Sequence, residues 1–206
     1  MAATQTTRGL AVAGMVGAVV AVIALFIEYQ YGLRTASGGS AAYEADQAGF
    51  FLASVGYIAI VIGLFRSRAG ADGWFGRVAI VIWLIAITAI ALGELLGLAG
   101  INAPLVLLPI GGVGQILGSI LTSVAVWRAG RWEGWRRYAP AAWTVIFFVT
   151  IVAAITAIPI LSIPAVDPYP TAPAPWLEGL WQVAWGVVGL ALYIEAGRTG
   201  IQRLTP

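Results

Sequence analysis

The chain has 206 residues, of which 60% are hydrophobic and only 10% are charged. Water-soluble domains are about 45–50% apolar and about 25% charged, so this composition excludes a soluble fold. The sequence has no lysine, cysteine or histidine, which excludes Schiff-base lysines, disulfides, thiolate nucleophiles and histidine-ligated metals or haem. No cofactor is therefore expected, and any chemistry would depend on carboxylic acids, aromatic side chains and the backbone.

The chain contains six apolar stretches, and a membrane-spanning helix needs about 20 such residues. The connections between the stretches are short, which favours antiparallel neighbours in one helical bundle that takes up residues 1–206. The sequence therefore predicts an all-α integral membrane protein with six spans, at about Gly9–Tyr31, Ala48–Phe65, Val78–Leu98, Pro104–Trp127, Ala139–Ile163 and Trp176–Glu195.

The first span has two different faces. Small residues recur on one face at a spacing of three and four, at Gly14, Gly17 and Ala21. Because small residues let helices approach closely in a membrane, this face is expected to contact another helix or a partner subunit. Glu28 continues the same face and is predicted to point into the bundle. The opposite face is expected to contact lipid and consists of Val12, Val16, Val19, Ile23 and Phe26.

The middle spans add three polar side chains to the predicted interior. Tyr57 lies in the second span, Glu94 in the third and Gln115 in the fourth. Gln115 belongs to a glycine-rich run, but no strand precedes this run and it lacks the third glycine of a dinucleotide-binding fingerprint. Gly114 and Gly118 are instead expected to pack against a neighbouring helix or a partner subunit.

The segment before the last span is rich in proline, and the last span is polar on one face. Six prolines between Pro159 and Pro175 predict an extended, stiff connection, and Pro159 is expected to kink or end the fifth helix. Glu195 and Arg198 have the spacing of a helix-end ion pair. The face of the last span that is predicted to point inward carries Glu178, Gln182, Trp185 and Gly189.

Arginines determine the predicted topology. Ten of the eleven lie near the termini or in the second and fourth connections, and only Arg34 lies on the other side. Because basic residues are retained on the cytoplasmic side, both termini are predicted to be cytoplasmic. The arginines would contact anionic lipid headgroups there, and their spread over four short segments argues against nucleic-acid binding. Arginine in place of lysine suggests a GC-rich genome, so we expect the cytoplasmic membrane of a bacterium.

The second and fourth connections are similar to each other. Arg68-Ala69-Gly70 and Arg128-Ala129-Gly130 are 60 positions apart, and the same offset matches Trp83 with Trp143. This match suggests parallel two-helix repeats about an axis along the membrane normal. Alternatively, short cytoplasmic turns favour arginine, glycine and tryptophan for topology and anchoring alone. The residues expected to anchor this boundary are Trp74, Trp127, Trp132, Trp135 and Tyr138.

Acidic, amide and aromatic side chains gather in the predicted outer half of the bundle. Like charges at low dielectric raise one pKa, so Glu28 and Glu94 are expected to share a proton, and aromatic faces bind cations. Alternatively, Glu28 and Glu178 are hydrated boundary residues and Gln115 forms an interhelical hydrogen bond. The predicted ligand-binding residues are Glu28, Tyr31, Tyr57, Glu94, Gln115, Glu178, Trp181, Gln182 and Trp185.

Three classes of function fit this sequence. The chain is either a binding or transport component for a small apolar or cationic solute, or a non-catalytic subunit of a membrane complex. The third class is a membrane enzyme in which Glu28 and Glu94 protonate an apolar, isoprenoid-like substrate, although the chain carries no catalytic motif. The six-span layout and the small-residue face of the first span resemble the substrate-binding subunits of energy-coupling-factor vitamin transporters. This resemblance covers the layout alone, and it implies a transport role.

Overall fold

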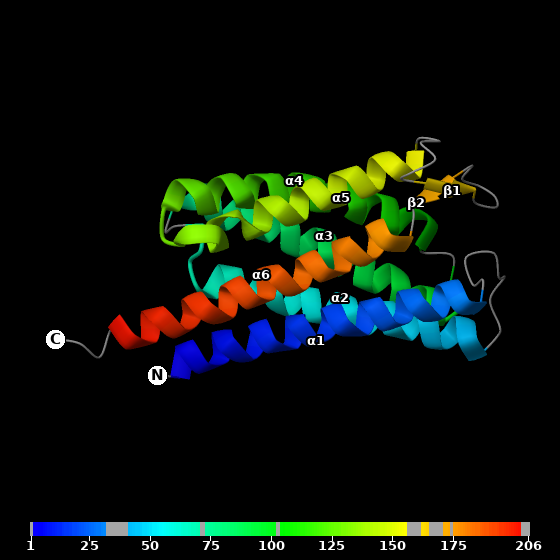
Figure 1. The fold of residues 1–206 in the computed structure, drawn as a ribbon, viewed down its shortest axis with the longest axis horizontal. Helices are drawn as coiled ribbons and strands as arrows, with labels where there is room; N and C mark the ends of the chain where they lie inside the picture. The colour runs from blue at the N-terminus through cyan, green and yellow to red at the C-terminus, as the bar shows by residue number, and fades with distance from the viewer. Residues whose placement is uncertain are drawn as a thin grey trace.

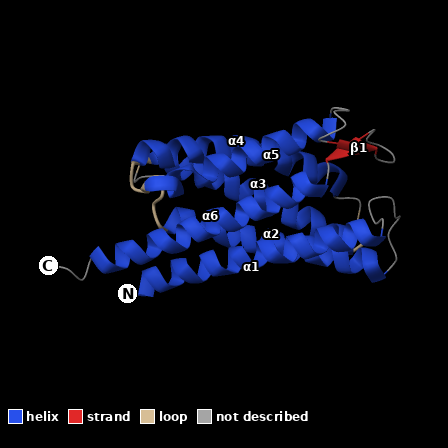
Figure 2. Cartoon of the chain, in the orientation of Figure 1, coloured by secondary structure: helices blue, strands red, loops and turns tan. Residues whose placement is uncertain are grey.

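The computed structural model describes residues 2–31, 41–70, 73–101, 104–155, 162–164, 171–173 and 175–202. Helices make up nearly all of this part of the chain, and a two-stranded sheet lies at one end of the bundle (Figure 2). The elements are α1 (Ala2–Tyr31), α2 (Ala41–Arg66), α3 (Trp74–Leu98), α4 (Pro104–Ala129), the 3-10 helix η2 (Gly134–Tyr138), α5 (Ala139–Ile155), β1 (Ser162–Pro164), β2 (Thr171–Pro173) and α6 (Pro175–Gln202).

The helices form a closed ring in which each one packs against the next along the chain. The last helix, α6, completes the ring because it contacts both α5 and α1 (Figure 1). Contacts between α2 and α6 cross the interior of the ring. This arrangement confirms an all-helical bundle with antiparallel neighbours, and it brings side chains of α2, α3, α5 and α6 to a common centre.

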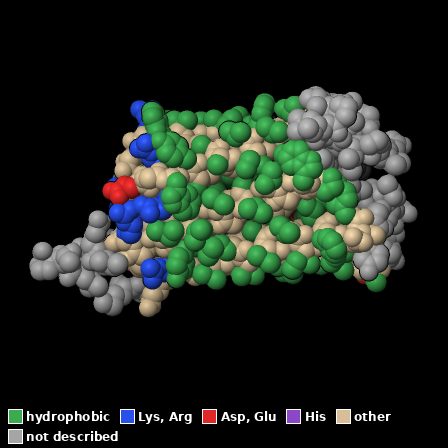
Figure 3. All heavy atoms as spheres, in the orientation of Figure 1, with side chains coloured by type: hydrophobic (Ala, Val, Ile, Leu, Met, Phe, Trp, Pro, Cys, Tyr) green, Lys and Arg blue, Asp and Glu red, His purple; other side chains and the backbone are tan. Residues whose placement is uncertain are grey.

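Five helices, α1, α2, α3, α4 and α6, are long and apolar enough to cross a membrane. Apolar side chains cover the flank of the bundle between its two ends (Figure 3). The fifth predicted span also begins as a helix, α5, whose described part has 17 residues. A span needs about 20 residues, so the chain is a membrane-embedded helical bundle in which five of the six predicted spans have the required length within the described residues.

The helix ends differ from those predicted by hydropathy. Helix α2 begins at Ala41 rather than Ala48, so it includes the buried residue Asp46. The fifth predicted span was too long, because Ile163 lies in strand β1 and pairs with Ala172 of β2. Extended backbone on both strands agrees with the restraint that the prolines of this segment impose on it.

The small-residue faces of α1 and α4 pack within the chain itself. A Cβ atom on Gly17 would lie 3.0 Å from the Cα atom of Gly56 on α2, and one on Gly118 would lie 2.5 Å from the Cα atom of Trp83 on α3. The lipid-like face of α1 is exposed as predicted, with Val16 57% exposed. These faces therefore join helices of the bundle, and α2 and α3 cover them.

Both described ends of the chain lie at the same end of the bundle as the connections α2–α3 and α4–α5 (Figure 1). Arginine side chains gather there on the face that Figure 3 shows, and we call this the arginine-rich end. The described parts of the two similar connections differ in detail, because positive φ occurs at Arg68 in one and at Gly130 and Gly134 in the other. The repeat stays a prediction. Trp132, expected at the membrane boundary, is buried instead.

Ion pairs connect α6 to the α4–α5 connection at the arginine-rich end. Glu195 of α6 pairs with Arg136 of η2, and it lies 4.0 Å from Arg198, its predicted partner. Arg198 in turn pairs with Glu133 at 2.8 Å. The Glu195 side chain is 9% exposed and the Glu133 side chain is 67% exposed, so the first pair is the one that burial strengthens.

Replacing Glu195 by alanine is expected to lower the free energy of unfolding by about 2 kcal/mol, because the Arg136 guanidinium loses its partner at a poorly hydrated site. Replacing the exposed Glu133 by alanine is the matched control, and it should cost less than about 1 kcal/mol. Unfolding in detergent followed by circular dichroism measures both values. Equal losses in the two variants would contradict the assignment of the buried pair.

Candidate functional site

A cluster of aromatic rings occupies the centre of the bundle. Trp185 of α6 is fully buried and stacks on Tyr57 of α2, with ring centroids 4.5 Å apart and planes 7° apart. Trp83 of α3 and Trp143 of α5 lie 5.2 Å and 4.8 Å from the Trp185 ring. Four helices therefore each contribute one ring to a single contact, and we call these four residues the aromatic centre.

The aromatic centre continues along α5 and α6. Phe147 lies 4.9 Å from Trp143, and Trp181 lies 5.0 Å from Phe147. Trp181 and Trp185 were predicted site residues, whereas Trp83, Trp143 and Phe147 were not. One feature of the sequence pointed to Trp83 and Trp143, their offset of 60 positions, and the centroids of these two rings lie 5.1 Å apart.

Polar side chains meet the aromatic centre on one side. The Tyr57 hydroxyl donates a hydrogen bond of 2.5 Å to the Gln182 Oε1 atom, and both residues are buried. Tyr57 therefore makes two contacts with α6. Its ring stacks on Trp185 and its hydroxyl hydrogen-bonds Gln182, and together these contacts hold the ring in place. The structure thus brings together Tyr57, Gln182 and Trp185, three residues that the sequence predicted as one site.

Glu94 of α3 lies beside this group. Its side chain hydrogen-bonds Ser54 of α2, and the Asp46 carboxylate and the Tyr57 hydroxyl interact with it electrostatically. The Glu94 Oε2 atom is buried and has no hydrogen-bond partner. Two carboxylates, Asp46 and Glu94, therefore act on each other near the ends of α2 and α3 that lie opposite the arginine-rich end.

The sequence did not predict the carboxylate of Asp46, which acts on Glu94 in the structure. The expected pairing of Glu28 with Glu94 stays a prediction. Asp46 was missed because hydropathy placed residues 41–47 in a loop, whereas they form the first two turns of α2. Glu28 itself is half-buried and lies three residues before the end of α1.

Gln115 of α4 is fully buried, and neither its amide nitrogen nor its amide oxygen has a hydrogen-bond partner. It shares a helix face with Gly111 and Gly118, which approach Ile90 and Trp83 of α3. Gln115 therefore lies at the α3–α4 interface. The predicted alternative, an interhelical hydrogen bond, is not made by this side chain.

The remaining predicted site residues lie near the end of the bundle. Glu178 is half-buried in the first turn of α6, and like Glu28 it has an interaction partner. Tyr31 is the last residue of α1, and its side chain is outside the described part of the structure. Within the described residues, no group of three or more acidic side chains could hold a metal ion.

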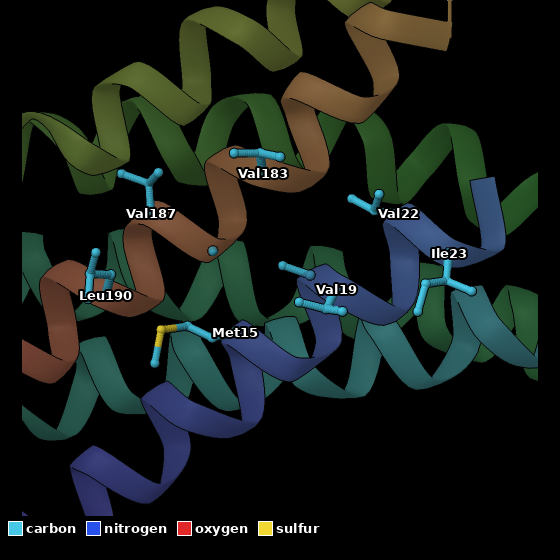
Figure 4. Close-up of a pocket in the computed structure, with 9 residues that line it drawn as sticks. Met15, Val19, Val22, Ile23, Val183, Val187 and Leu190 are labelled. Carbon is cyan, nitrogen blue, oxygen red and sulfur yellow. The ribbon is translucent and has the colours of Figure 1, made fainter. Parts of the chain in front are cut away.

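A cavity of about 410 Å³ lies elsewhere, between α1 and α6. Apolar residues line it, and none of the predicted ligand-binding residues is among them (Figure 4). Four of those residues are buried in the interior of the bundle instead, namely Tyr57, Gln115, Gln182 and Trp185. Comparisons of this chain with protein-family models, curated proteins and solved structures found no match.

Proposed function

We propose that this chain is a membrane component that binds a small, largely apolar or cationic solute at Tyr57, Glu94, Gln182 and the aromatic centre. One observation carries the proposal: residues that neighbour Tyr57 or Gln182 carry buried polar atoms without hydrogen-bond partners. They include Glu94 Oε2 and the indole nitrogens of Trp181 and Trp185. A buried polar atom without a partner costs about 1–3 kcal/mol, so such a group calls for an explanation. A bound cationic solute would supply the partner that the Glu94 Oε2 atom lacks.

The chemistry of these residues favours a cation with apolar substituents. Glu94 and Asp46 supply negative charge on one side, and the face of the Tyr57 ring that does not stack on Trp185 would supply aromatic surface that attracts cations. Both carboxylates lie about 8 Å or less along their helices from the end opposite the arginine-rich end. A solute would therefore enter from that end, which the arginine distribution assigns to the outside.

The proposed setting is the cytoplasmic membrane of a bacterium, with six spans and both termini in the cytoplasm. The support is the collection of arginines at one end of the bundle, next to anionic lipid headgroups. A carrier of solutes across this membrane, or the solute-binding subunit of a larger carrier, would present Glu94 to the outer solution.

A second candidate function is favoured by the position of Glu94 next to the Tyr57–Trp185 stack. A carboxylic acid beside aromatic faces could protonate a double bond of an isoprenoid-like substrate, and the faces would stabilise the carbocation that forms. The variant Glu94→Gln distinguishes the two functions, because they predict different effects on substrate binding. Glu94→Gln would keep substrate binding and lose product formation in an enzyme, whereas it would lose binding in a solute carrier.

The test uses tetraphenylphosphonium, an aromatic lipophilic cation, as the probe. Quenching of tryptophan fluorescence by the probe is titrated for the purified chain in detergent. Glu94→Gln is expected to weaken binding at least tenfold, or about 1.4 kcal/mol, and Tyr57→Phe should weaken it less. The matched control is Glu44→Gln, which removes the same charge from an exposed position on α2 and should bind like the wild type.

Two results would overturn the proposal. One is unchanged probe binding in Glu94→Gln, and the other is an equal loss in Glu44→Gln, which would mean that surface charge alone attracts the probe. Mass spectrometry of the organic extract of the natively purified chain gives an independent readout. The wild type should retain a small molecule that Glu94→Gln does not retain.

A further inference from the structure

The cavity between α1 and α6 opens onto the surface of the bundle that faces lipid. Figure 4 shows the residues of the two helices that line it. Val19, Ile23 and Val183 at its edge are 61%, 54% and 53% exposed. The cavity is therefore a groove in the flank of the bundle, and we call it the α1–α6 groove. Its walls are Met15, Ala18, Val19, Val22 and Ile23 of α1, and Val183, Gly186, Val187 and Leu190 of α6.

The groove follows a seam that ends at an arginine. On α1, positions 22, 18, 15 and 11 share one face, and Arg8 is the next residue on it. The Arg8 guanidinium lies 4.9 Å from the centre of the Tyr193 ring on α6. It also approaches Gly197, where a side chain would collide with it. Arg8 thus closes the seam at the arginine-rich end.

Arg8 has capacity to bind an anion. Its Nε atom is buried and has no hydrogen-bond partner. Two other arginines at this end already form ion pairs, since Arg136 contacts Glu195 and Arg198 contacts Glu133. This donor lies on the same face of α1 as the groove, beyond the closely packed Ala11. A site for a negative charge and a site for a hydrocarbon chain therefore follow one another along α1.

The spacing along α1 matches the depth of one lipid leaflet. At 1.5 Å per residue, Arg8 is about 10 Å from Met15 and about 22 Å from Ile23. Half of a bilayer with its headgroups measures about 20–22 Å. If Arg8 lies at the level of the headgroups, the groove extends from about the first third of an acyl chain to the middle of the membrane.

We infer that the α1–α6 groove and Arg8 form a binding site for one anionic phospholipid, with its phosphate at Arg8 and an acyl chain in the groove. The positive charge of Arg8 favours an anionic phospholipid over a second copy of the chain as the occupant of the groove. A parallel copy would bring its own arginine-rich end to Arg8, and Glu133 and Glu195 at that end already pair with arginines. The inference needs the membrane location of the bundle and does not depend on the proposed solute site.

The experiment measures lipid binding to the delipidated full chain in detergent by native mass spectrometry. Phosphatidylglycerol and phosphatidylcholine with the same acyl chains are added in equal amounts. The wild type is expected to bind one phosphatidylglycerol with at least tenfold preference. Arg8→Gln should reduce the preference to less than twofold, and Arg8→Lys should retain most of it. Val183→Trp, which fills the groove from its exposed edge, should reduce binding of both lipids.

Two matched variants lie away from the groove. Arg77→Gln removes an exposed arginine from the same end of the bundle, and Val145→Trp adds the same bulk at an exposed position of α5. Both should bind lipid like the wild type. The inference is overturned if the wild type shows no preference, or if the two control variants lose as much binding as Arg8→Gln and Val183→Trp. The other possible occupant of the groove is a second copy of the chain, and Val183→Cys tests it because the chain has no cysteine of its own. A disulfide-linked dimer of this variant in lipid would also overturn the inference.

Discussion

Trp185→Ala is expected to lower the free energy of unfolding by about 3–5 kcal/mol, the range for removing a large aromatic side chain from a packed core. The Trp185 ring is fully buried and contacts rings from α2, α3 and α5. Its loss would leave a cavity where four helices meet, and the packing between helices is what holds a bundle together in lipid. Unfolding by a denaturing detergent, followed by circular dichroism, measures the loss.

The control for Trp185→Ala is Trp127→Ala. Trp127 is 60% exposed near the end of α4, so its removal should cost less than about 1 kcal/mol. Trp185→Phe retains an aromatic ring that can stack on Tyr57 and should lie between the two alanine variants. A loss for Trp185→Ala no larger than that for Trp127→Ala would mean that the aromatic centre contributes little to the stability of the bundle.

The number and course of the helices could be predicted from the sequence, and their exact ends could not. Hydropathy marks the part of a helix that lipid must surround, because polar residues are excluded from that part. A helix continues beyond it wherever its residues favour helix. The first turns of α2 show this, since they contain Tyr43, Glu44 and Asp46. The same difference explains why Asp46 was missed.

The faces of the helices were also readable, but their partners were not. The spacing of Gly14, Gly17 and Ala21 predicted a packed face, and these residues are buried. A small side chain permits close approach by any helix, so the pattern carries no information about which helix approaches. That α2 covers this face depends on the complete arrangement of the ring, which only the structure supplies.

The candidate site was predicted as a set of residues rather than as a geometry. Tyr57, Gln182 and Trp185 do lie together, as the polar stripe of the last span indicated. Trp83 and Trp143 could have been added, because both lie well inside their spans. Trp74, by contrast, begins α3 and is 76% exposed. Depth within a span thus separates Trp83 and Trp143 from Trp74, but it does not identify Trp132, which is buried in the connection between α4 and α5. The Asp46–Glu94 pair needed the true start of α2.

Gly118→Ala is the second substitution with a large expected effect. A Cβ atom at position 118 would lie 2.5 Å from both the backbone nitrogen and the Cα atom of Trp83. No rotation of a side chain can relieve a collision between backbones, so α3 and α4 would have to separate. We expect a loss of about 3 kcal/mol in the free energy of unfolding, measured in detergent by the same denaturation experiment.

Gly112 on the same helix provides the matched comparison for Gly118, because a Cβ atom there would meet nothing within 4 Å. Alanine favours helix over glycine by about 1 kcal/mol in water, and both variants gain this preference. Their difference therefore isolates the contact with Trp83. Gly112→Ala should be as stable as the wild type or more stable. If Gly118→Ala is equally stable, α3 and α4 are not in the close contact that positions Trp83 in the aromatic centre, and the core of the candidate site must be arranged differently.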